Sequence, residues 1–374
     1  MNGFRFEKPR PKPARTYNPN RFNALDSGIV YVVVLVMFYV VSLLFGKVFG
    51  ERLRELYKYD VYAYMIVSLL VSQLTIFAVA AVYSLLRRVN PFGGGGYVAG
   101  FDGVQVLMSL LLIMGVMMTF YHTHLQFGQD TEKIIGGGFT PDMNLSPYSG
   151  IFALIYIALT VLCPAIFEEM LFRGIVMRGL EQFGSIAAIV LSAIAFALMH
   201  GNFSQLILQF IGGLAIASVV VITKNWLIGS LMHGFNNLFS IFYGLLLENI
   251  VGGLTGEYIR MATDASLILI GVALLTVSVI YFIKLAFEKK KKEFSGKPPV
   301  GKFERVKYYE VLENGELKTV PYYVRVALPE WGEENEKRYK IKGKYRKINR
   351  KSPFMASCIV FGAAIIVAIV FMFI

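Results

Sequence analysis

Long apolar runs separated by short polar connections dominate the pattern of the chain. About 20 apolar residues are enough for an α-helix to cross a bilayer, and nine runs approach or exceed that length. They are residues 28–49, 60–86, 104–124, 150–172, 185–200, 204–223, 226–248, 265–286 and 354–374. The pattern therefore predicts an all-α polytopic membrane protein, a bundle of about eight transmembrane helices followed by a ninth C-terminal transmembrane helix.

Composition supports the membrane class, because hydrophobic residues make up 56% of the 374 residues. The first run is about 22 residues long, which is too long for the core of a signal peptide, so we expect it to remain in the mature protein. The two cysteines, Cys163 and Cys358, both lie in apolar runs. No disulfide framework is therefore predicted.

Basic residues alternate along the chain in a way that predicts its orientation. Lys and Arg are retained on the cytoplasmic side of a membrane. They occur in the N-terminal tail, at Arg87 and Arg88, at Arg173 and Arg178, at Lys224 and in the run 289–292, whereas connections 125–148, 201–203 and 249–263 contain almost none. We expect the protein to be integral to the cell membrane, with a cytoplasmic N-terminus and an extracytoplasmic C-terminus.

The same pattern divides the chain into four parts. They are a basic cytoplasmic tail (1–27), a membrane domain (28–286), a basic cytoplasmic segment (287–353) and the final span (354–374). Two strand-like runs around Asn314-Gly315 predict a β-hairpin in the third part. Residues 284–353 carry most of the net charge of +12, which favours anionic lipids of the inner leaflet, and no nucleic acid, as partners.

Two adjacent carboxylates and an arginine interrupt the apolar run that begins near Gly150, in the stretch 165–174. An ionised side chain at mid-bilayer costs about 2.5–3.5 kcal/mol, so an intramembrane cluster of this kind indicates function. Glu169 and Arg173 are four residues apart and are expected to pair on one helical face. Glu168 points about 100° away and is expected to remain unpaired and available for chemistry.

Polar residues of two later helices are expected at the same depth as Glu168. At 1.5 Å per residue, Glu168 lies about 8 Å below the cytoplasmic surface, His200 about 12 Å and His233 about 10 Å. Asn237 follows His233 by four residues and faces the same way. The four side chains are therefore predicted to converge on one cavity.

An unpaired carboxylate, two histidines and an asparagine suit the activation of water for amide hydrolysis. Glu168 would be the general base, with His200 sharing or shuttling the proton. His233 and Asn237 would donate hydrogen bonds to the developing oxyanion. We expect no cofactor. The alternative is a zinc protease that uses Glu168, His200 and His233 as ligands, although no HExxH signature is present.

Three short motifs carry a resemblance to a known family. EExxxR at Glu168-Glu169-Arg173, FxxxH at Phe196–His200 and HxxxN at His233–Asn237 occur in this order on apolar segments. They resemble the motifs of the CAAX protease and bacteriocin-processing family of intramembrane glutamic endopeptidases. This family, also called the abortive-infection domain, includes the Ras-converting CAAX endopeptidases. The resemblance covers about residues 105–250.

The resemblance implies a membrane endopeptidase with catalytic Glu168, His200, His233 and Asn237 and supporting Glu169 and Arg173. Its substrate would be a CAAX-type, leader or membrane-associated peptide or protein, with or without a lipid modification. Two alternatives remain open. One is a non-proteolytic membrane scaffold of the same family; the other is a proton-coupled transporter, although no internal repeat is found.

Overall fold

The computed structural model describes residues 21–92, 102–135, 145–251, 253–254, 256–294, 304–313, 316–324 and 354–371. Its helices are α1 (Ala24–Tyr59), α2 (Val61–Arg87), α3 (Gly103–Ile135), α4 (Ser149–Leu171), α5 (Met177–Leu180), α6 (Ser185–Met199), α7 (Leu206–Thr223), α8 (Trp226–Leu246), α9 (Glu257–Phe294) and α11 (Phe354–Phe371). Shorter π- and 3-10 turns are η1 (Phe172–Val176), η2 (Glu181–Phe183), η3 (Phe203–Gln205) and η4 (Leu247–Val251).

Six helical stretches in the described part of the chain are long and apolar enough to cross a membrane. They correspond to α1, α2, α3, the run from α4 through η2, α7 and α9. All nine predicted runs coincide with a helix, but α6 and α11 are shorter apolar helices and α8 is not among the six. The chain is thus a polytopic helical membrane protein, while the predicted count of nine spans is not confirmed.

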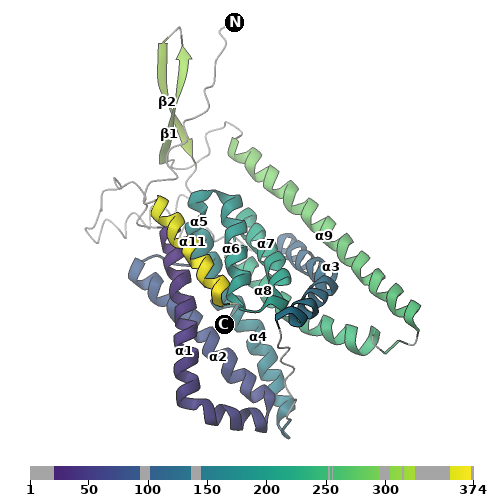
Figure 1. Ribbon diagram of the computed structural model, residues 1–374. Coiled ribbons are helices and arrows are strands. Elements are labelled where there is room, and N and C mark those ends of the chain that lie inside the picture. Colours follow the sequence, from purple (N-terminus) through teal and green to yellow (C-terminus); the bar gives the residue numbers. More distant parts are fainter. Residues whose placement is uncertain are drawn as a thin grey trace.

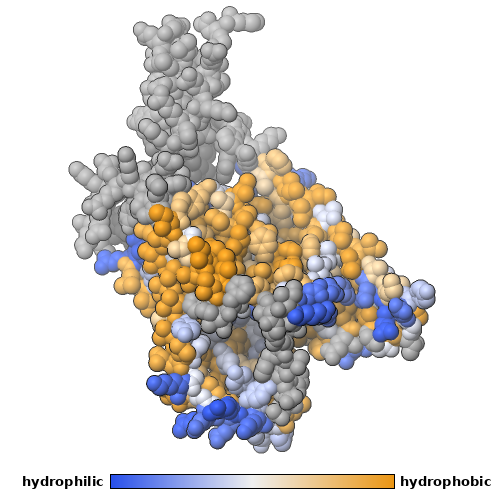
Figure 2. All heavy atoms as spheres, in the orientation of Figure 1, coloured by the Kyte–Doolittle hydropathy of each residue, from blue (hydrophilic) through white to orange (hydrophobic). Residues whose placement is uncertain are grey.

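The helices form a bundle in which α1, α2 and α4 lie on one side and α3 and α9 on the other (Figure 1). Between them α7 packs against α6 and α8, both α7 and α8 contact α3, and α8 also contacts α4, while α11 covers α1. Hydrophobic residues cover the flanks of the bundle, whereas hydrophilic residues gather at the lower ends of the helices (Figure 2). This distribution is the one that a lipid environment favours.

The start of α1 lies four residues before the predicted span. Asn23 accepts a hydrogen bond from Asp26 N, and the Asp26 side chain accepts one from Asn23 N, so the two form a capping box. Asp26 also pairs with Arg87, with Nε and Oδ1 2.8 Å apart. The helix therefore begins inside the segment that was predicted to be a polar tail, because this cap satisfies its first amides.

The largest buried side chains surround η1, where α4 passes into α5. Phe172, Ile175 and Met177 are fully buried there, and Phe196 of α6 packs its ring at 5.1 Å from that of Phe172, edge to face. Tyr31 of α1 donates its hydroxyl to Ala195 O at 2.7 Å. This core fixes the ends of α4 and α6 relative to each other, and both helices contribute residues to the motifs described above.

Two strands lie in the basic segment, β1 (Glu304–Glu313) and β2 (Glu316–Val324). They pair antiparallel, from Glu304 opposite Val324 to Glu313 opposite Glu316. The pairing is irregular between Arg305 and Lys307. Asn314 and Gly315, which were predicted to form the turn, lie outside the described residues.

Candidate active site

The two adjacent carboxylates lie in the last turn of α4, and both are buried, with Glu168 5% and Glu169 2% exposed. Glu169 Oε1 forms an ion pair with Arg173 Nη1 at 2.8 Å and lies 2.9 Å from His233 Nδ1. The predicted pair of Glu169 and Arg173 is therefore present. Glu169 has a second partner, His233, which sequence spacing did not reveal.

Arg173 occupies the π-helical turn η1, a geometry that often accompanies functional sites. Its Nη2 donates to Gly213 O of α7 at 3.3 Å, and its guanidinium carbon lies 4.8 Å from the centre of the Phe196 ring. A Cβ on Gly213 would come within 3.2 Å of that ring. The glycine thus permits α7 to approach closely enough to hold Arg173.

Glu168 is not unpaired, which corrects the prediction from the sequence. Gln73 of α2 donates its Nε2 hydrogen to Glu168 Oε1 at 2.7 Å. The other oxygen, Oε2, is buried and has no hydrogen-bond partner among the described residues. It lies 3.8 Å from His233 Nε2. One oxygen is therefore held by the protein and the other is left for a ligand.

The hydrogen-bond network fixes the orientation and the tautomer of His233. An ionised carboxylate can only accept a hydrogen bond, so Nδ1 of the ring carries the hydrogen that it donates to Glu169. Nε2 then lies 3.8 Å from Glu168 Oε2, too far for a direct hydrogen bond, and a water beside the pair could contact both atoms. His233 can donate from Nε2 only when its ring is protonated on both nitrogens.

His200 is the C-cap of α6, and its ring is held by its own helix. Its Nδ1 lies 2.9 Å from the carbonyl oxygen of Phe196, which can only accept, so Nδ1 donates and Nε2 is left as an acceptor. The Phe196 ring contacts both histidines, with centroid distances of 5.0 Å to His200 and 5.6 Å to His233.

Asn237 has a contact that was not foreseen. Its Nδ2 donates to Thr160 O of α4 at 2.9 Å. Thr160 lies four residues before Pro164, which is inside the helix and has no N–H to give to that carbonyl. Asn237 therefore replaces the missing helical hydrogen bond. The sequence predicted that the Asn237 amide would donate to an oxyanion, but only its second amide hydrogen is left for that role.

The alternative zinc set was tested against the geometry. Among the residues that the structure describes, no three His, Cys, Asp or Glu side chains form a group that could hold a metal ion. Glu168, His200 and His233 thus do not converge as three ligands.

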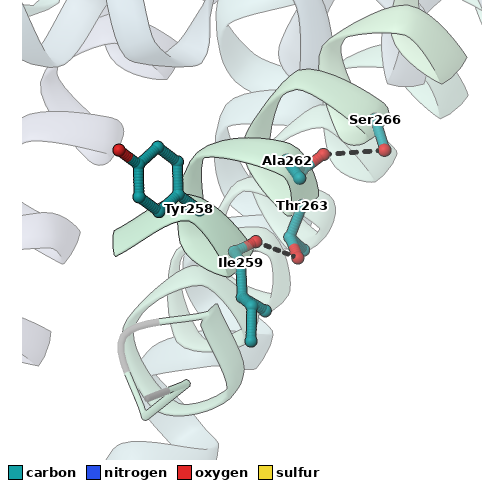
Figure 3. Close-up of a pocket in the computed structure, with 5 residues that line it drawn as sticks. All are labelled: Tyr258, Ile259, Ala262, Thr263 and Ser266. Atoms are coloured by element: carbon teal, nitrogen blue, oxygen red, sulfur yellow. Dashed lines mark hydrogen bonds between the residues drawn. The ribbon is translucent and has the colours of Figure 1, made fainter. Parts of the chain in front are cut away.

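A shallow depression on the outside of the bundle is unrelated to this cluster. All its lining residues, Tyr258, Ile259, Ala262, Thr263 and Ser266, belong to α9 (Figure 3). The hydroxyls of Thr263 and Ser266 bond the carbonyls of Ile259 and Ala262 in the same helix. They are therefore not aimed at a ligand.

Comparison with known proteins agrees with the motifs. Residues 150–239 match the family model described as type II CAAX prenyl endopeptidase Rce1-like. No curated protein and no solved structure matches the chain. The matched segment runs from the start of α4 to the middle of α8 and contains all three motifs. Over residues 150–239, the chain is therefore similar to the Rce1-like family of type II CAAX prenyl endopeptidases.

Proposed function

We propose that the protein is an intramembrane endopeptidase in which Glu168 activates a water molecule to hydrolyse a peptide bond. One observation carries this proposal. Oε2 of Glu168 is buried without a partner and faces His233 Nε2 at 3.8 Å. A water beside this pair, within hydrogen-bond distance of both atoms, would join the two groups, since buried polar atoms are nearly always hydrogen-bonded. The family match over residues 150–239 supports the reaction class.

His233 lies beside both carboxylates. When both ring nitrogens carry a hydrogen, Nδ1 donates to Glu169 and Nε2 donates to the water, which in turn donates to Glu168.

The reaction then proceeds by addition and elimination. The water oxygen attacks the peptide carbonyl carbon while its proton passes to Oε2 of Glu168. The carbonyl oxygen becomes an oxyanion, which His233 Nε2–H and the second Asn237 amide hydrogen stabilise. The C–N bond breaks as the leaving nitrogen takes a proton from Glu168, with His200 Nε2 accepting the remaining hydroxyl proton. Glu169 and Arg173 hold His233 in place.

We further propose that the substrate reaches the site from the cytoplasm or from the inner leaflet. The orientation rests on basic connections, which include Arg178 and Lys224 at the ends of the helices nearest the cluster. It places the N-terminus in the cytoplasm and the C-terminus outside. The substrate class is a CAAX-type, leader or membrane-associated peptide, and anionic inner-leaflet lipids would bind the basic residues around 289–292.

The experiment that tests this function compares membrane proteomes of cells that express the wild-type protein or Glu168→Gln. We expect uncleaved peptides to accumulate only in the variant. Asp264→Asn is a matched control, because it makes the same change in α9, where Asp264 lies 3.7 Å from His122. Identical peptide patterns for all three proteins, at equal protein levels, would instead favour a scaffold role.

A further inference from the structure

A single glutamine side chain lies inside α2, where the nearest other polar side chains are the small hydroxyls of Ser72 and Thr75. Gln73 is 5% exposed and its neighbours in sequence include Leu69, Leu70, Val71 and Leu74. Polar side chains within a membrane-spanning helix are costly and usually face a functional interior. The side chain of Gln73 faces the carboxylate of Glu168, which we have proposed as the general base.

The chemistry of the pair decides which end of the amide faces the carboxylate. An ionised carboxylate offers no hydrogen, so the amide nitrogen must be the group that faces it, as it does at 2.7 Å. The amide oxygen then points away. It is buried and accepts no hydrogen bond from the described residues. Gln73 therefore serves Glu168 and no other protein group that the structure describes.

The packing of α2 against α4 holds this pair in register. Phe77, one turn after Gln73, packs against Phe167, which directly precedes Glu168; their ring centroids are 4.8 Å apart and the rings are tilted relative to each other. The two helices are in extensive contact along their length. The position of Gln73 relative to Glu168 is thus fixed by the core and does not depend on the hydrogen bond alone.

We propose that Gln73 is a positioning residue of the hydrolytic site. By holding Oε1, it stops the carboxylate from rotating and directs Oε2 toward the water and His233. This inference rests on the proposed function, and it extends the site to α2, which lies outside the family-matched segment 150–239. The peptidase site is then incomplete in the matched segment alone.

The test uses Gln73→Met in the full-length purified protein with a peptide substrate taken from the proteome comparison. Methionine keeps the length of the side chain and removes the donor. We expect kcat per folded molecule to fall about tenfold to a hundredfold, the range for one lost hydrogen bond to a charged group, with KM unchanged within about twofold. Such a split between kcat and KM is not expected if Gln73 only supports the fold.

Thr75→Val is the matched control. Thr75 lies two residues away at a similar depth, is 8% exposed, and bonds only Val71 O of its own helix at 2.7 Å. It should retain wild-type kcat. Wild-type kcat in Gln73→Met, beside an inactive Glu168→Gln, would overturn this inference and leave the proposed function intact. A wild-type protein that cleaves no peptide would overturn both.

Discussion

Asp60, at the start of α2, and Glu168, near the end of α4, are both buried carboxylates, but the protein satisfies their hydrogen-bonding capacity to different extents. Asp60 lies between α1 and α2 and is fully buried. Its Oδ1 accepts from Tyr62 N and Ala63 N. Its Oδ2 accepts from Ser146 N, from Ser146 Oγ and from Ser149 Oγ. Every lone-pair direction of Asp60 is thus used by the protein, and the connection before α4 is tied to the start of α2.

Glu168 has one hydrogen bond where Asp60 has five. Its second oxygen has no partner in the described part of the chain, and the same is true of the Gln73 amide oxygen beside it. Glu169 Oε2 also lacks a hydrogen bond, but Glu169 is compensated by Arg173 and His233. A satisfied buried carboxylate stabilises a fold, whereas a half-satisfied one beside a histidine is suited to bind and activate water.

Replacing each carboxylate by an amide tests this difference, and the largest effect on activity is expected at Glu168. We expect Glu168→Gln to lower kcat by about a hundredfold to ten-thousandfold, because it removes the base. The unfolding midpoint should remain close to wild type, since Gln73 Nε2 can still donate to the amide oxygen. Peptide cleavage and thermal unfolding of the purified variant check both points; a folded variant with wild-type kcat would contradict the assignment.

Glu169→Gln should affect stability more than any other change in the cluster. It leaves the buried Arg173, 3% exposed, without its charged partner at 2.8 Å. Removing one member of a buried ion pair costs about 3–5 kcal/mol. The level of folded protein in membranes should fall, in contrast to Glu168→Gln. Equal abundance of the two variants on a quantitative immunoblot would show that the two carboxylates are not divided in this way.

Asp60→Asn should have the opposite effect to Glu168→Gln: kcat should be preserved and the free energy of unfolding lowered by about 1–3 kcal/mol. Burial opposes ionisation of Asp60, but the hydrogen bonds from Ser149, Ser146 and Ala63 outweigh it and hold the pKa of this carboxyl well below its usual range. Its stabilising effect is therefore complete above about pH 4, its unfolded pKa, and is lost as the pH falls further.

Unfolding midpoints measured from pH 7 down to pH 3 check the Asp60 prediction. The difference between wild type and Asp60→Asn should be largest near neutral pH and should shrink below about pH 4. Thr223→Val is a suitable control for handling at low pH, because its hydroxyl bonds only Val219 O of its own helix. A difference that grows toward acid pH would contradict the assignment.

The smallest effect is expected for Pro164→Ala. The new amide hydrogen of residue 164 would compete with Asn237 for the Thr160 carbonyl. Asn237 would then be held less firmly, and we expect kcat to fall about tenfold, a fraction of one oxyanion-donor loss. The unfolding midpoint should stay level or rise, because helix α4 gains a hydrogen bond. Unchanged kcat would show that the Thr160 carbonyl does not position Asn237.

Local spacing was enough to predict the pair of Glu169 and Arg173, because helical geometry alone brings residues four apart together. The membrane class and the segment that carries the motifs were also predictable. Gln73 could not be assigned to Glu168 from the sequence, because the pairing of α2 with α4 is a tertiary contact between residues 95 positions apart.

The need for a hydrogen-bond donor to the Thr160 carbonyl could, by contrast, have been predicted from the sequence. A proline inside a predicted span leaves the carbonyl four residues earlier without a donor, and some polar side chain has to supply one. The contact of His233 with Glu169 could not be predicted from the sequence. It depends on the approach of α8 to α4, where a Cβ on Gly229 would come within 3.3 Å of Glu169 Oε2.

Lys289 also fixes the depth of the long helix α9. Its ammonium group donates to the carbonyls of Ile222 and Thr223 at the end of α7. Helix α7 has 18 residues and rises about 27 Å, close to the thickness of the hydrocarbon layer. The same boundary of the hydrocarbon layer therefore crosses α9 at Lys289. Counting back about 20 residues places the opposite boundary near Leu269, so the first three turns of α9, with Arg260 and Asp264, stand in the opposite headgroup region.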